Sequence, residues 1–102
     1  MKIRKIKKLK VNSTVFNIKW VNEYGGAWFD YGKEEIGFNV KDCTQLEILN
    51  MINHELFEIC CTEMHVRFKR PDVSSDYIFV FDHRQHTTII EMMSGLLSEF
   101  LA

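Results

Sequence analysis

The segment H-E-L-F-E at residues 54–58 brings one imidazole and two carboxylates close together. On a helix, His54 and Glu58 are four residues apart and lie on one face, about one turn from each other. This spacing allows both side chains to hold the same metal ion. Glu55 lies about 100° around the helix from His54, where a carboxylate can activate a water molecule as general base. The segment therefore predicts hydrolytic metal chemistry.

A helix predicted over residues 45–64 positions these side chains. Thr44 and Glu47 have the T-x-x-E spacing of a capping box, in which each side chain bonds the backbone of the other residue. Apolar residues then recur at helical spacing: Leu46, Leu49, Ile52, Leu56, Ile59, Cys60 and Met64. Glu55 is the only charged member of the row formed with Ile48, Ile52 and Ile59. A carboxylate in an apolar row is costly unless it is paired, so Glu55 is expected to have a partner.

The flanking segments predict an α+β domain. Strands are expected at residues 14–21, 27–31, 35–40 and 76–81, with a polar connection at 67–75. The last strand is apolar enough to be buried on both faces, and a final helix begins at Asp82 or Gln85. The predicted order is β-β-β-α-β-α, a small antiparallel or mixed sheet with two packed helices.

Length, cysteines and hydropathy restrict the class of protein. The 102 residues fit a single domain, 1–102. Three cysteines, two of them adjacent, do not make a disulfide framework, and they favour reduced thiols in a cytoplasmic protein. No stretch approaches the roughly 20 apolar residues that span a bilayer, so no membrane partner is expected.

Charge is unevenly distributed along the chain. Residues 1–10 hold six of the thirteen basic residues and no acidic one, which leaves seven basic against fourteen acidic residues, a net charge of −7, in the remainder. Apolar residues such as Ile3, Ile6 and Leu9 interrupt the basic run, which favours a packed basic segment over an arm that binds nucleic acid. Nucleic acid is therefore disfavoured as a partner.

The segments at 26–40 and 44–56 resemble the core of zincin-like metallopeptidases. In small members of that group, a hairpin strand precedes a capped helix bearing H-E-x-x-H; here Glu58 replaces the second histidine. The chain is also similar to small phage and prophage proteins of unassigned activity with an H-E-x-x-E helix. Those end in H-x-x-I-x-x-L-x-x-x-L, which this chain matches from His86, with Met92 in place of the first leucine.

The resemblance implies a fold and a ligand set. The fold would be a minimal zincin-like domain, and His86, at the start of the last helix, would join His54 and Glu58 as third metal ligand. His83 is the runner-up. Such a set suits zinc, although iron, nickel and manganese accept similar ligands. His65 and Cys61, on the same side of the first helix, are weaker candidates.

The predicted ligand set and the resemblance are compatible with two functions. The first is a minimal zinc-dependent hydrolase, of the metallopeptidase type, in which Glu55 is catalytic. The second is a non-catalytic zincin-like protein-interaction module of phage or prophage origin. The expected partner is a protein or peptide in both cases, and the sequence makes no prediction of oligomeric state. A third hypothesis, nucleic-acid binding through the basic segment, predicts steeply salt-dependent binding.

Overall fold

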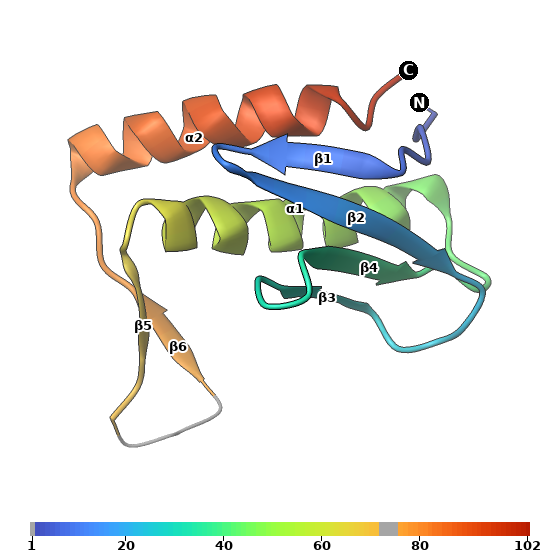
Figure 1. Cartoon of the computed structure of the whole chain (residues 1–102), viewed down its shortest axis with the longest axis horizontal. Coiled ribbons are helices and arrows are strands. Elements are labelled where there is room, and N and C mark those ends of the chain that lie inside the picture. The colour runs from blue at the N-terminus through green and yellow to red at the C-terminus, as the bar shows by residue number, and fades with distance from the viewer. Residues whose placement is uncertain (1, 72–75) are drawn as a thin grey trace.

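The computed structural model describes residues 2–71 and 76–102 and confirms the α+β class (Figure 1). A small mixed sheet is combined with two helices. The elements in chain order are β1 (Lys8–Val11), β2 (Thr14–Val21), β3 (Ala27–Asp30), β4 (Glu35–Asn39), α1 (Gln45–Glu63), β5 (Arg67–Lys69), β6 (Tyr77–Phe79) and α2 (His83–Ser98).

The main sheet has four strands in the order β1-β2-β4-β3. The β2–β4 pair is parallel, and the two outer pairs are antiparallel. Alternation along β2 and β4 sends Phe16, Ile36 and Phe38 to one face, where all three are fully buried. That face forms the floor of the core. The other face carries polar side chains such as Lys8 and Lys19, which are exposed.

Helix α1 covers the apolar face of the sheet and contacts β3 and β4. It begins with the predicted capping box: the Thr44 amide donates to Glu47 Oε1 at 2.9 Å, and the Glu47 amide donates to Thr44 Oγ1 at 3.1 Å. Its apolar row, including Ile52 and Ile59, is fully buried. This packing fixes the rotation of α1 about its axis and thereby the direction in which Glu55 points.

Helix α2 runs alongside α1 (Figure 1). It is capped by Asp82, whose side chain accepts from the Gln85 amide at 2.8 Å, in agreement with the predicted start. Ile89 is its fully buried side chain. The chain then ends beside its beginning: the Arg4 amide donates to the Phe100 carbonyl at 2.7 Å, and the two termini lie together (Figure 1).

The N-terminal segment packs as the sequence favours. Strand β1 buries Leu9 and Val11 while Lys8 and Lys10 are exposed. Ile3 is also buried. The basic residues are therefore the solvent side of a packed segment. Among the described residues, no helix is both long and apolar enough to cross a membrane.

The region after α1 differs from the prediction. The expected polar connection at 67–75 contains strand β5, and its residues 72–75 lie outside the described residues. Strand β6 was predicted to be buried on both faces, and this is wrong: Ile78 and Phe79 are 42% and 36% exposed. The reason is that β6 pairs with β5 in a separate two-stranded hairpin, which projects from one end of the molecule (Figure 1). Phe79 contacts Phe57 of α1, and within the described residues the hairpin still leaves Ile78 and Val80 42% and 59% exposed.

Candidate metal centre

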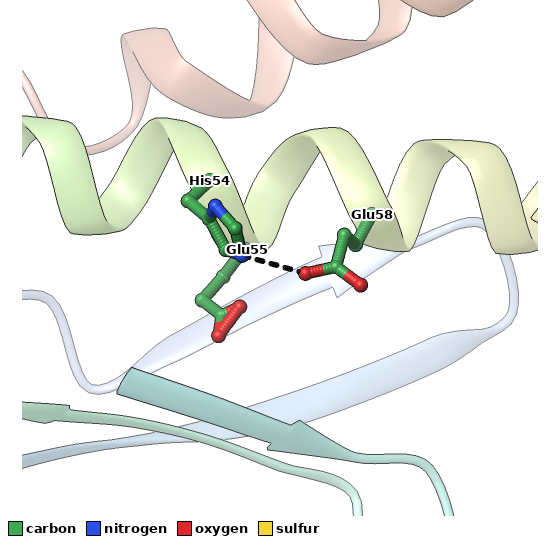
Figure 2. A group of neighbouring side chains, drawn as sticks. All are labelled: His54, Glu55 and Glu58. Carbon is green, nitrogen blue, oxygen red and sulfur yellow. Dashed lines mark ion pairs between the residues drawn. The ribbon is translucent and has the colours of Figure 1, made fainter. Parts of the chain in front are cut away.

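Three side chains of α1 form a group that could hold a metal ion. His54, Glu55 and Glu58 each offer one ligand atom, and these atoms lie within 4.8 Å of one another. His54 Nε2 and Glu58 Oε2 are 2.8 Å apart, as the i, i+4 spacing predicts (Figure 2). His54 is exposed, whereas the Glu58 side chain is only 17% exposed. One imidazole and two carboxylates suit zinc and several other divalent transition metals.

Both oxygens of Glu58 are engaged. Oε2 faces His54, and Oε1 accepts a hydrogen bond from Arg67 Nε of strand β5 at 3.2 Å. Arg67 is itself mostly buried, with 20% of its side chain exposed. The carboxylate is therefore held from two sides, by its own helix and by the hairpin.

Glu55 is the most unusual member of the group. It is 5% exposed, and within the described chain its Oε2 has no hydrogen-bond partner. Burial raises the pKa of the Glu55 carboxyl above its ordinary value; His54 and Arg67 oppose this rise, and Glu58 adds to it. A buried carboxyl oxygen without a partner is costly. The side chain extends from α1 toward the sheet (Figure 2) and, together with His54, lines a hollow.

The group lies along a series of hollows. A cavity of about 300 Å³ between α1 and the glycine turn before β3 is lined by His54, Glu55 and Gly26. Gly26 and its neighbour Gly25 have positive φ angles of 80° and 126°, which glycine adopts without strain. Hollows of about 650 Å³ and 590 Å³ adjoin it, and Asn50 lines all three. His54 therefore lies between two of these hollows, since it lines both the one that Glu55 also lines and the one that Glu58 also lines.

The structure does not bring the predicted third ligand into the group. His86 is exposed, and its ring stacks on Phe81 with the centroids 6.0 Å apart. Phe81 in turn contacts Phe57 of α1. His83, the runner-up, is exposed at the first residue of α2, 6.3 Å from the His86 ring. Neither belongs to the group found among residues 2–71 and 76–102, and the ligand role of His86 stays a prediction.

The weaker candidates lie outside the group as well. His65 is exposed beyond the end of α1, with a φ of 58°. Cys61 is fully buried, and its burial raises the pKa of the thiol to about 11, so the thiol stays protonated at neutral pH. Cys60 packs in the core, and burial raises the pKa of its thiol to about 12.

Sequence reasoning missed the contact between Arg67 and Glu58. The two residues are nine apart in the sequence: Glu58 lies on α1, and Arg67 lies on β5, the strand that follows it. The Glu-to-Arg spacing is not one that pairs on a continuous helix. A charge of opposite sign shortly after the end of α1 was the only signal available.

No family model matches the chain, and neither a curated protein nor a solved structure matches it. The likeness to zincin-like metallopeptidases and to phage proteins thus stays a prediction from motifs. The geometry of the group formed by His54, Glu55 and Glu58 fits a metal ion, because the ligand atoms converge and Glu55 has an unpartnered buried oxygen beside them.

Proposed function

We propose that the protein is a metal-dependent hydrolase acting on peptide bonds, with zinc as the first candidate metal. One observation carries the proposal: a carboxylate that is 5% exposed, with an unpartnered oxygen, lies beside a convergent histidine and glutamate at the edge of a cavity. An acidic side chain that serves only as a solvated helix residue has no reason to be buried in this way.

His54 and Glu58 would hold the ion, through Nε2 and Oε2, which already approach to 2.8 Å. Hydrolytic zinc sites normally have three protein ligands and one open position. His86 is proposed as the third ligand and His83 as its alternative. A zinc ion bound there would supply Lewis-acid polarisation of the scissile carbonyl and of the attacking water.

Glu55 would act as general base and then as general acid. Its carboxylate takes a proton from the attacking water while the water oxygen bonds to the carbonyl carbon. The same proton passes to the departing amine nitrogen as the carbon–nitrogen bond breaks. Burial, which raises the pKa of Glu55, brings the group closer to the neutral pH at which it must exchange this proton.

A peptide substrate is supported by the surroundings of His54. Hollows adjoin it on the side of the glycine turn and on the side of the hairpin, where Tyr77 and Phe79 line the wall. Among the described strands, β3 pairs with β4 alone, and a free strand edge can bind an extended peptide by main-chain hydrogen bonds.

The experiment is a peptidase assay with zinc-loaded protein and a mixture of unstructured peptides, read by mass spectrometry. Glu55→Gln should bind zinc yet lose at least about 100-fold in rate, the contribution typical of a general base. Glu91→Gln, the same change at an exposed position of α2, should cleave at the wild-type rate. Equal rates for wild type and Glu55→Gln would overturn the assignment of Glu55.

A second candidate function is a non-catalytic zincin-like module that binds another protein, as phage or prophage proteins of this kind would. The observation that favours it is the exposed apolar surface of the β5–β6 region, formed by Phe68, Ile78, Phe79 and Val80. This candidate predicts that Glu55→Gln changes no biological activity. Metal binding alone does not distinguish the two functions.

His86→Ala and His83→Ala test the third ligand. If His86 ligates, its removal should weaken zinc binding by about 10-fold or more, and His83→Ala should leave the affinity unchanged. The reverse result would assign the role to His83. Unchanged affinity in both variants would leave His54, Glu55 and Glu58 as the complete protein ligand set.

A further inference from the structure

Arg67 connects the β5–β6 hairpin to the candidate metal centre. Its Nε donates to Glu58 Oε1 at 3.2 Å, and both side chains are mostly buried. Because a carboxylate is planar, fixing one oxygen restricts the position of the other. The second oxygen, Oε2, is the one that lies 2.8 Å from His54 Nε2.

The guanidinium of Arg67 is itself held by two aromatic rings. Its Cζ lies 3.6 Å from the ring centroid of Tyr77 on β6 and 5.1 Å from that of Phe29 on β3. Arginine favours such stacking because its charge is spread over a flat group that is weakly hydrated. The side chain thus contacts α1, the edge strand of the main sheet and the hairpin at once, and Glu58 receives its hydrogen bond from a donor with little freedom to move.

We infer that Arg67 is a positioning residue, which holds Glu58 so that Oε2 is presented to the metal ion together with His54. The inference rests on the proposed metal site. Groups that hydrogen-bond a metal ligand orient it, and their loss commonly weakens metal binding about 10–100-fold. The hairpin therefore serves the site through this one side chain as well as through the wall that it forms.

The direction in which metal affinity changes when Arg67 is replaced distinguishes positioning from simple electrostatics. A positive charge near a cation site repels the ion, so Coulomb's law alone predicts that removing Arg67 strengthens metal binding. Positioning predicts that removing it weakens binding. Arg67→Lys keeps the charge but loses the flat guanidinium and its Nε donor, so positioning predicts weaker binding for this variant too.

The test is zinc affinity measured by competition with a chromophoric chelator. Arg67→Gln should bind zinc about 10–100-fold more weakly than wild type, and Arg67→Lys should not restore the affinity. Lys69→Gln is the matched control, because it removes the same charge from an exposed position on the same strand. Thermal unfolding of each zinc-free variant identifies any that fail to fold. Tyr77→Leu, which keeps Arg67 and removes its stacking ring, gives a second measurement and should weaken binding by about 2–5-fold.

A double-mutant cycle shows whether Arg67 acts through Glu58. In the Glu58→Gln background, Arg67→Gln should cause no further loss of zinc affinity, because the residue that it positions is already changed. Additive losses, unchanged or stronger binding by Arg67→Gln, or an equal loss in Lys69→Gln would overturn the inference while leaving the metal site in place. A wild-type protein that binds no zinc would overturn both.

Discussion

Helix α1 contacts two regions of different construction, the four-stranded sheet and the β5–β6 hairpin. On one side the helix packs on the four-stranded sheet, where Phe16, Phe38 and Ile52 are fully buried in a continuous core. Beyond its carboxyl end the chain forms the β5–β6 hairpin, whose strands are three residues each and whose apolar side chains Phe68 and Ile78 are about half exposed. A two-stranded hairpin has little stability of its own. The comparison indicates that the sheet supplies most of the buried core, and it agrees with the proposal that the hairpin positions a ligand of the candidate metal centre.

The largest expected effect is a loss of stability caused by a change in the four-stranded sheet. Phe38→Ala removes a fully buried ring from β4 and should lower the free energy of unfolding by about 3–5 kcal/mol. Phe79→Ala removes a ring that is 36% exposed on the hairpin and contacts Phe57, and should cost about 1 kcal/mol. Urea denaturation measures both. Equal losses would mean that the hairpin belongs to the core of the fold.

The sequence predicts helix α1 better than it predicts the hairpin. Helix α1 was predictable because its signals are local: the Thr44–Glu47 capping box and the buried row around Glu55 lie within one segment. The hairpin was not, because an apolar run such as that around Ile78 has the same pattern whether or not a second layer covers it. The Arg67–Glu58 contact and the place of His86 depend on how separate elements pack, which no local pattern specifies.

A smaller effect on the free energy of unfolding is expected from the buried carboxyl of Glu55. Because burial raises the pKa of Glu55 above 4.5, the folded protein binds more protons than the unfolded chain between pH 4.5 and the raised value, and this contribution to stability falls as pH rises through that window. In zinc-free protein at pH 7, Glu55→Gln should therefore be more stable than wild type, because the buried side chain no longer carries a charge.

Urea midpoints with a chelator present, taken at pH 7 and pH 4, measure this difference. It should shrink at the lower pH, which lies below the ordinary Glu pKa of 4.5, because the carboxyl is then mostly neutral in both the folded and the unfolded chain. Zinc should reverse the order at pH 7, because a ligand that binds only the folded state stabilises it. If zinc-free Glu55→Gln is the less stable protein at pH 7, the Glu55 carboxylate has a stabilising partner in the folded protein.

The smallest expected loss of stability comes from changing the N-terminal cap of α1. Thr44→Ala removes the side chain that accepts from the Glu47 amide and should cost about 1 kcal/mol. Thr44→Ser keeps the hydroxyl and should cost much less. Thermal unfolding separates the two, and equal losses would show that the capping bond does not stabilise this helix.

The most direct test of the proposed metal centre is the zinc content of protein purified without an affinity tag or chelator, measured by elemental mass spectrometry for wild type and His54→Ala. We expect about one zinc ion, or one other transition-metal ion, per wild-type chain and none in the variant. Wild-type protein that carries no metal and takes up no added zinc would contradict this expectation, as would a His54→Ala protein that binds zinc as wild type does.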